Sequence, residues 1–234
     1  MIKQDNTPSS VRDLPAIYVL PALLVVGLWS YWTTLGEMAH RWHIDPQYSH
    51  GYLVPGFAAW LMWYRRHEYQ NRPLVPSWWG IPLLLAGIGV RLFSAYYYFE
   101  WFDGLSMIPM LLGGALLLTG WQGLSWSWPS IVFLGFMVPL PHRIETMMSL
   151  PLQEFATASS NFILQMSGIP STAEGNIISL TENRKLNVVE ACSGLRMLVI
   201  FMAISSAVAL LSDKPLWERV LIVASGVPIA LISN

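Results

Sequence analysis

Long runs of apolar residues alternate with short polar segments along this chain, and the runs predict membrane-spanning helices. Crossing a bilayer takes about 20 consecutive, predominantly apolar residues in an α-helix. The candidate spans, some of them short, are residues 15–35, 51–64, 78–98, 105–119, 128–140, 195–211 and 220–234. The pattern therefore predicts an all-α polytopic membrane protein, a bundle of seven spans in one domain that covers residues 1–234.

The longest segment between two candidate spans, residues 142–191, begins with a helical pattern. From about Glu145 to Ser167, apolar and polar side chains recur on opposite faces of a helix. The apolar face carries Leu152, Phe155, Phe162 and Met166, and the polar face carries Gln153, Thr157, Asn161 and Gln165. A two-faced helix without basic residues either lies at the membrane interface or closes over a polar cavity.

The second part of this segment has the two-residue period of β-strands. Apolar and polar residues alternate over residues 176–181 and again over 185–190, with the turn residues 182–184 between them. This arrangement predicts a small β-hairpin. Residues 142–191 thus form an extracytoplasmic insertion of one helix and one hairpin, and the second strand runs directly into Cys192.

Composition supports the membrane assignment and excludes some partners. Hydrophobic residues make up 54% of the chain and charged residues 12%, whereas soluble domains carry about 25% charged residues. With a net charge of -1 and no basic stripe, the sequence gives no reason to expect a nucleic-acid partner. It contains no nucleotide-binding glycine loop, Ser/Lys dyad or intramembrane metalloprotease motif, so we expect no cofactor. His40 and His43 have a spacing that metal sites use, but they lack a clear further ligand, and we interpret them as interfacial histidines.

The distribution of basic residues predicts the orientation, because cytoplasmic loops carry an excess of Lys and Arg. With the N-terminus in the cytoplasm, the inner segments hold Lys3, Arg12, Arg65, Arg66, Arg72, Lys214 and Arg219. The outer segments then hold only Arg41, Arg143, Arg184 and Lys185. This orientation places Cys192 at the outer face.

Cys192 is the only cysteine of the chain, and it stands where an extended segment gives way to a helix. A thiol reacts as the thiolate, which helix N-termini and nearby cations favour. The amides of the first helical turn and Arg196 supply both, and the same amides can stabilise an oxyanion. Gly194 leaves room for a peptide to approach, and Ser193 forms with it the Ser-Gly pair that precedes the helix. These features are typical of acyl transfer through a thioester.

Each of these residues also has a simpler structural interpretation. Cys192 can be an inert packing residue, and Arg196 can extend to the membrane interface. Glu190 either holds Arg196 and orients the hairpin or forms a plain interfacial salt bridge. His50 supports the site or is one more interfacial histidine. For Arg91, inside a span, reaching the interface and binding a substrate carboxylate remain equal alternatives.

Three segments resemble those of one family of membrane enzymes. Glu190-Ala-Cys-Ser-Gly-Leu-Arg196 resembles the cysteine motif of the exosortase/archaeosortase transpeptidases. Tyr48-Ser-His-Gly-Tyr-Leu-Val-Pro55, which precedes an apolar run and two arginines, is similar to the N-terminal signature of the bacterial exosortases. Val227-Pro-Ile-Ala-Leu-Ile-Ser-Asn234 is similar to the segment that leads into the family's Asn-x-x-Arg motif.

The resemblance implies an enzyme of about eight spans in the bacterial inner membrane. It would cleave C-terminal sorting signals of the Pro-Glu-Pro (PEP-CTERM) type from exported proteins and transfer them to an acceptor linked to extracellular polysaccharide. The family uses a cysteine, an arginine and a histidine, and Cys192 matches the first. Asn234 would open the arginine motif, so we expect a C-terminally truncated chain whose arginine and histidine lie beyond Asn234. The alternative from another class is a non-catalytic scaffold or transporter subunit for exopolysaccharide assembly.

Overall fold

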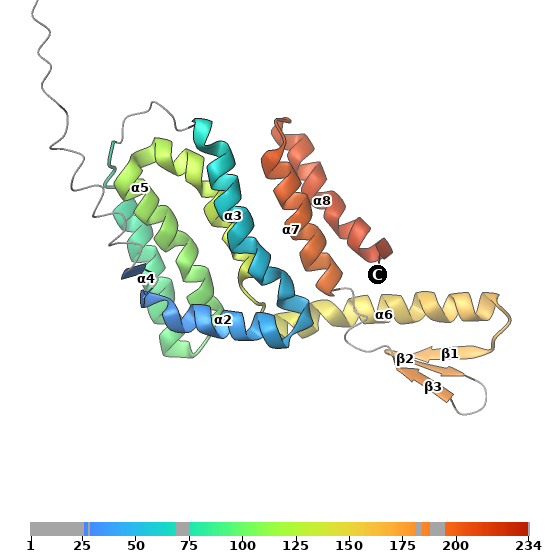
Figure 1. The fold of residues 1–234 in the computed structure, drawn as a ribbon. Helices are drawn as coiled ribbons and strands as arrows, with labels where there is room; N and C mark the ends of the chain where they lie inside the picture. The colour runs from blue at the N-terminus through green and yellow to red at the C-terminus, as the bar shows by residue number, and fades with distance from the viewer. Residues whose placement is uncertain (1–25, 28, 69–74, 181–183, 188–194, 234) are drawn as a thin grey trace, which may run out of the picture.

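The computed structural model describes residues 26–27, 29–68, 75–180, 184–187 and 195–233. Helices dominate the described residues, and a small sheet interrupts them before the last helical pair (Figure 1). The helices are α2 (Trp32–Ile44), η1 (Pro46–Tyr52), α3 (Leu53–Tyr64), η2 (Arg65–Glu68), α4 (Gly80–Tyr97), α5 (Glu100–Phe133), η3 (Leu134–Met137), α6 (His142–Met166), α7 (Leu195–Leu211) and α8 (Leu216–Ser233). The strands are β1 (Ser171–Glu174), β2 (Ile177–Leu180) and β3 (Arg184–Asn187).

Three helical segments of the described chain are long and apolar enough to cross a membrane. They are Gly80–Tyr97, Glu100–Met137 and Leu216–Ser233, and Arg196–Leu211 is a shorter apolar helix. The fold class is therefore confirmed as a mostly helical membrane protein with a small extra sheet. The count of seven spans remains a prediction, since most of the expected first span, residues 15–35, lies outside the described residues.

Apart from residues 138–140, the predicted spans at 105–119 and 128–140 fall in the helical segment α5 with η3. Gly120 interrupts this segment with φ 72° and ψ −167°, a conformation that glycine adopts without the steric cost of a Cβ. At this point the helix bends back on itself, so α5 consists of two arms (Figure 1). The two predicted spans correspond to these arms.

The first arm of α5 packs closely on α4, and small residues make this possible. A Cβ on Gly113 would lie 2.8 Å from the backbone nitrogen of Leu84 and 2.9 Å from the carbonyl oxygen of Gly80. A Cβ on Gly87 would lie 2.6 Å from Cγ of Met110. Lipid is as apolar as the side chains, so close packing of this kind supplies much of the association between helices in a membrane.

The main core lies where α2, η1, α3, α5 and η3 meet. Its buried side chains are Tyr31, Met38, Trp42, Tyr48, Val54, Ala58, Met107, Phe133, Met137 and Val138. The core therefore joins the signature segment at residues 48–55 to the exit of α5. α7 and α8 form a second closely packed pair, in which Ser205 Oγ donates to the Val223 carbonyl at 3.4 Å.

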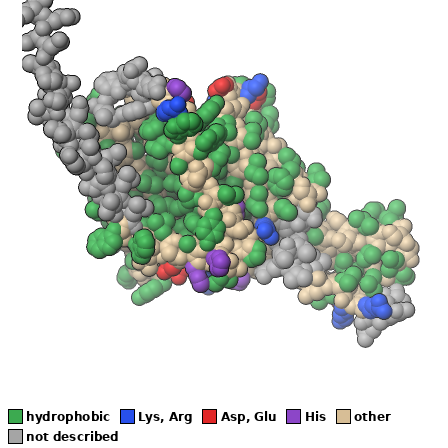
Figure 2. Space-filling model, viewed as in Figure 1, with side chains coloured by type: hydrophobic (Ala, Val, Ile, Leu, Met, Phe, Trp, Pro, Cys, Tyr) green, Lys and Arg blue, Asp and Glu red, His purple; other side chains and the backbone are tan. Residues whose placement is uncertain are grey.

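Charged side chains gather at the two ends of the bundle, and the band between them is largely uncharged (Figure 2). The segment around Arg65 and Arg66 lies at the same end as the loop between α7 and α8 (Figure 1). The helices α2 and α6 lie at the opposite end, where α7 begins. The distribution of basic residues likewise predicts that these two segments share one side of the membrane.

The insertion after α5 forms as predicted in its main parts. α6 covers the expected helix, and β2 and β3 pair antiparallel, with Ile178 opposite Leu186. The prediction of two strands was incomplete, because β1 pairs with β2 on the other side, with Ser171 opposite Leu180. β1 has the sequence Ser-Thr-Ala-Glu and three of its four residues are exposed. Such a polar edge strand lacks the alternation of apolar residues by which strands are recognised.

Candidate functional site

Most of the predicted site residues lie outside the described part of the chain. These are the predicted nucleophile Cys192 and its neighbours Glu190, Ser193 and Gly194, together with Asn234. Arg196 is described: it lies in the first turn of α7 and is exposed. Its guanidinium makes no ion pair with any residue that the structure describes. Within the described residues, no carboxylate neutralises this cation at the start of α7.

The start of α7 lies beside two other elements of the predicted site. α7 contacts η1, which contains His50, and it also contacts α6. The end of α7 that carries Arg196 is the end nearest α6 (Figure 1). The fold therefore brings the segment that follows the cysteine motif and the Tyr48-Ser-His-Gly51 segment to the same end of the bundle, although about 140 residues of sequence separate them.

His50 is held through both of its ring nitrogens. Nδ1 lies 3.1 Å from the Gln47 carbonyl oxygen, and Nε2 lies 3.2 Å from the Phe136 carbonyl oxygen. A neutral imidazole donates from only one nitrogen, whereas an imidazolium donates from both. Each ring nitrogen of His50 lies against a carbonyl oxygen, so the side chain connects η1 to η3. The simplest function of this side chain is therefore structural. Its predicted support of the catalytic site remains a prediction.

Gly51 allows a second contact that holds the same turn, η1, in place. Its neighbour is the indole ring of Trp42, and a Cβ at position 51 would overlap that ring. Trp42 is buried and donates from Nε1 to the Met137 carbonyl at 2.9 Å. The glycine therefore lets η1 approach α2 closely enough for Trp42 to reach the exit of α5. The signature segment is in this way explained by packing and backbone hydrogen bonds.

A polar cluster joins η1 to the first turn of α6. Gln47 donates from Nε2 to Glu145 Oε1 at 2.9 Å, and the other carboxylate oxygen of Glu145 lies 3.8 Å from His142 Nδ1. The hydroxyl of Tyr48 is buried near this cluster and makes no hydrogen bond of normal geometry with the described residues. Burial raises the pKa of Tyr48 to about 12, the charge of Glu145 adds to the rise, and the nearby Leu140 backbone opposes it. Tyr48 is thus a neutral phenol at physiological pH.

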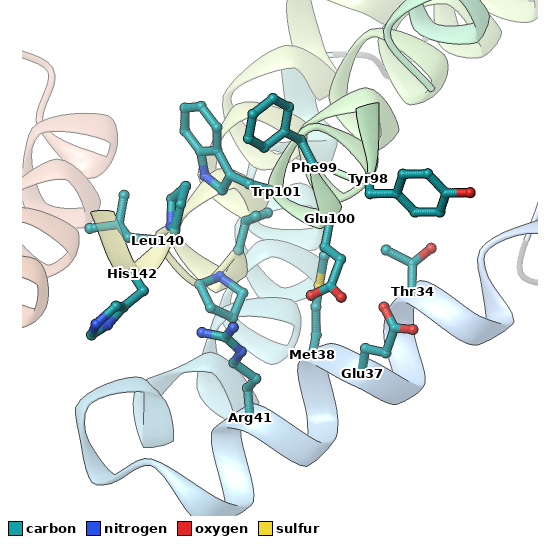
Figure 3. A pocket seen from close by; sticks show the side chains of 13 residues that line it. Thr34, Glu37, Met38, Arg41, Tyr98, Phe99, Glu100, Trp101, Leu140 and His142 are labelled. Atoms are coloured by element: carbon teal, nitrogen blue, oxygen red, sulfur yellow. The ribbon is translucent and has the colours of Figure 1, made fainter. Parts of the chain in front are cut away.

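A cavity of about 310 Å³ opens at this end of the bundle between α2, the turn before α5 and the segment that leads into α6. Its polar lining includes Glu37, Arg41, Glu100 and His142, and Trp101 adds an aromatic wall. Figure 3 shows that the carboxylates of Glu37 and Glu100 and the guanidinium of Arg41 point into the cavity. None of these residues belongs to the predicted site. The only signal was their position in polar segments beside predicted span ends.

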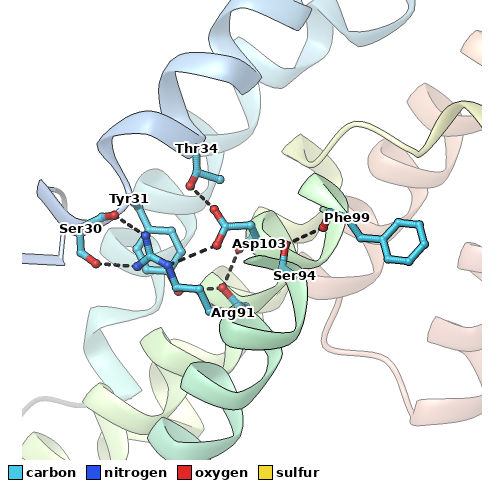
Figure 4. Close-up of polar contacts among 8 residues, drawn as sticks. Ser30, Tyr31, Thr34, Arg91, Ser94, Phe99 and Asp103 are labelled. Carbon is cyan, nitrogen blue, oxygen red and sulfur yellow. Dashed lines mark hydrogen bonds and ion pairs between the residues drawn. The ribbon is translucent and has the colours of Figure 1, made fainter. Parts of the chain in front are cut away.

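Beside this cavity, Arg91 takes part in a polar network of three elements (Figure 4). Its Nη1 and Nη2 donate to Oγ and the carbonyl oxygen of Ser30, each at 2.5 Å, and its Nε lies 3.3 Å from Asp103 Oδ1. The other carboxylate oxygen of Asp103 accepts a hydrogen bond from Thr34. The guanidinium also lies 4.3 Å from the ring centroid of Tyr31. Arg91 therefore has a carboxylate partner within the protein, and the two alternatives for its function remain predictions.

Metal-ligating residues do not gather in the described part of the chain, where no group of three or more His, Cys, Asp or Glu is placed to hold an ion. The polar groups that do gather are suited to hydrogen bonding and to binding charged groups.

Comparison with known proteins gives one clear result. No curated protein and no solved structure matches the chain. A family model described as transmembrane exosortase matches residues 42–234, which is most of the sequence and includes both the Tyr48-Ser-His-Gly51 segment and the cysteine motif. The chain belongs to the transmembrane exosortase family.

Proposed function

We propose that this protein is a membrane-embedded cysteine peptidase and transpeptidase that acts on exported proteins. The observation that carries the proposal is the family match across residues 42–234, within which the only cysteine of the chain stands three residues before α7. The substrates are proteins with a C-terminal sorting signal of the PEP-CTERM type. The reaction takes place at the outer face of the bacterial inner membrane, with the N-terminus in the cytoplasm.

In the proposed reaction, the Cys192 thiolate adds to the carbonyl carbon of the scissile peptide bond. The C–N bond then breaks, and the leaving amine takes up the proton that the thiol has lost, so that a thioester remains. An acceptor nucleophile attacks the thioester, its proton is released, and the thiolate is regenerated. An acceptor linked to extracellular polysaccharide yields transfer, and water yields hydrolysis.

The described residues support two parts of this chemistry. The first amides of α7 have no partners within the helix, so they carry partial positive charge where an oxyanion would form. Arg196 adds a full charge in the same turn, and this charge forms no ion pair with the described residues. Both features stabilise negative charge, which develops first on the thiolate and then on the carbonyl oxygen.

The test is the processing of a reporter with a C-terminal sorting signal in cells that produce the full-length protein. We expect Cys192→Ala to reach the membrane at the wild-type level and to abolish processing. Ser125→Ala is a suitable control, because this exposed serine only donates a hydrogen bond within its own helix, to the Gln122 carbonyl. Unchanged processing in Cys192→Ala would overturn the proposal and favour a non-catalytic scaffold of exopolysaccharide assembly.

A second measurement separates the thiol chemistry from folding. We expect Cys192 to react with an alkylating reagent at pH 7, and we expect Arg196→Gln to slow this reaction, because the mutation removes a cation that favours the thiolate. Arg196→Lys is the matched variant, since it keeps the charge and should retain most of the rate. Equal rates in all three proteins would show that Arg196 does not act on Cys192.

A further inference from the structure

The exposed and buried faces of α6 are the reverse of those of a helix on a water-soluble protein. Large apolar side chains are exposed, among them Phe155 at 61% and Phe162 at 63%. The opposite face carries polar residues, of which Gln153 is 4% and Thr157 is 0% exposed. A helix of a soluble protein buries its apolar stripe and exposes its polar one. The surroundings of α6 must therefore include an apolar medium.

The direction of α6 indicates what this medium is. The spanning helices run roughly parallel to one another, and α6 runs across their ends and projects beyond them (Figure 1). Its first turn is fixed to the bundle by the hydrogen bond between Gln47 and Glu145. Figure 2 shows hydrophobic side chains over much of the visible surface of this projecting arm. A helix that is attached at the end of a bundle and runs across it follows the surface of the bilayer.

The small sheet occupies the other side of α6. The sheet lies farther from the spanning helices than α6 does (Figure 1), and both β1 and β2 contact α6. Gln165 Nε2 donates to the Ser171 carbonyl at 2.8 Å, which fixes the first strand to the end of the helix. The sheet therefore leaves the apolar face of α6 uncovered within the described structure.

We propose that α6 is an in-plane membrane helix whose apolar face lies in the acyl-chain region and whose polar stripe faces the extramembrane sheet. The partner is the lipid itself, because α6 begins shortly after the end of Glu100–Met137, a segment long and apolar enough to cross a membrane. After Arg143, α6 contains no Lys or Arg, and it carries Glu145 and Glu154. Binding therefore depends on apolar area, and attraction to anionic headgroups contributes little.

This arrangement sets the depth of the neighbouring segments. The sheet and the start of α7 both contact α6. A helix that is held at the bilayer surface therefore keeps them at a constant distance from that surface. This placement of α6 does not depend on whether Cys192 is a nucleophile.

The test uses nitroxide labels on single cysteines in the full-length protein, with Cys192 replaced by Ser, reconstituted into vesicles. Labels at positions 155 and 162 probe the apolar face. A label at position 160 is the control, because Ser160 is exposed and lies two turns after Gln153 on the polar side. Collisions with oxygen, which concentrates in lipid, are compared with collisions with a water-soluble nickel chelate. Vesicles of phosphatidylcholine alone and of phosphatidylcholine with phosphatidylglycerol test the effect of headgroup charge.

We expect the ratio of oxygen to nickel collisions to be several-fold higher at positions 155 and 162 than at position 160, in both kinds of vesicle. Equal ratios at the three positions would overturn the proposal. Labels at 155 and 162 that are shielded from both reagents would also overturn it. In that case, dipolar broadening between labels would identify a second copy as the cover, and its absence would identify another segment of the protein. A high ratio only with the anionic lipid would contradict the expectation that apolar area carries the binding.

Discussion

Gln47 donates a hydrogen bond from Nε2 to Oε1 of Glu145 at 2.9 Å, although 98 positions separate the two residues in the sequence. Through this bond, the turn that contains the exosortase-like signature fixes the beginning of α6. Because α7 contacts both η1 and α6, the bond also stabilises the surface against which α7, the helix after the cysteine motif, packs. The signature thus contributes to the site by placing other elements correctly.

Tyr48, next to Gln47, makes the stability of this junction sensitive to alkaline pH. Its folded-state pKa is about 12, whereas a tyrosine in an unfolded chain titrates near 10. Between these two values the unfolded chain loses the phenolic proton and the folded chain keeps it, so stability present below pH 10 is lost as the pH rises to 12. The loss should be on the order of 2 kcal/mol.

We expect Tyr48→Phe to be within about 1 kcal/mol of wild type at neutral pH, because the buried hydroxyl makes no normal hydrogen bond with the described residues. Above pH 10 the variant should become the more stable protein. Thermal unfolding in detergent from pH 8 to 12 measures both effects. Tyr98→Phe is the control, since Tyr98 is 90% exposed and its replacement should leave the wild-type pH dependence in place. Parallel curves for wild type and Tyr48→Phe would contradict the assignment.

Gly51 should tolerate no larger residue. In Gly51→Ala the new methyl group overlaps the Trp42 indole, so the ring must move and its hydrogen bond to the Met137 carbonyl is lost. We expect a loss of about 2–4 kcal/mol in the free energy of unfolding, from overpacking together with the lost hydrogen bond. Gly56→Ala is the matched control in the following helix, because a Cβ there meets nothing within 4 Å. A stable Gly51→Ala protein would show that Trp42 has room to move.

The local elements of the insertion could be predicted because their patterns are local. The face of α6 that carries Phe155 and Phe162 repeats with the helical period, and β2 and β3 alternate with the strand period. The basic residues Arg65 and Lys214 likewise indicated which loops share a side of the bundle. Each of these signals is contained within a few consecutive turns or strand residues.

The long-range contacts were not predictable from the same signals. His50 was selected as a candidate site residue, but its Nε2 lies against the Phe136 carbonyl, a backbone group that any residue at position 136 would provide. The two faces of α6 were identified, whereas the burial of the polar face depends on which elements pack there. The sharp bend at Gly120 depends on the backbone conformation of one residue. That residue lies in a charge-free stretch where spans of similar composition follow one another, so composition does not mark the bend.

Gly113 and Gly114 are neighbours in α5 that should respond very differently to substitution. A Cβ on Gly113 would lie within 3 Å of the α4 backbone, but on Gly114 it meets nothing within 4 Å. We expect Gly113→Ala to separate α4 from α5 and to cost about 1–3 kcal/mol, while Gly114→Ala leaves stability unchanged. Thermal unfolding of the two variants in the same detergent provides the measurement. Equal midpoints would mean that the two helices adjust without loss.

The pair of Arg91 and Asp103 should be strongly coupled, because each side chain is mostly shielded and the other partners of the network depend on both. Arg91→Met leaves the Asp103 carboxylate without its cation, and we expect a loss of about 1–3 kcal/mol. Arg91→Lys should recover only part of the lost stability. The guanidinium donates to Ser30 from its two terminal nitrogens while its Nε faces Asp103, and an ammonium group cannot reproduce this geometry.

Asp103→Asn in the Arg91→Met background provides the decisive comparison. With the carboxylate neutralised, no uncompensated charge remains, so the double variant should be more stable than Arg91→Met alone. The coupling energy follows from thermal or denaturant unfolding of the four proteins of this double-mutant cycle. Effects that add within about 0.5 kcal/mol would show that the two residues act independently, and Arg91 would then be free to bind a group from outside the protein.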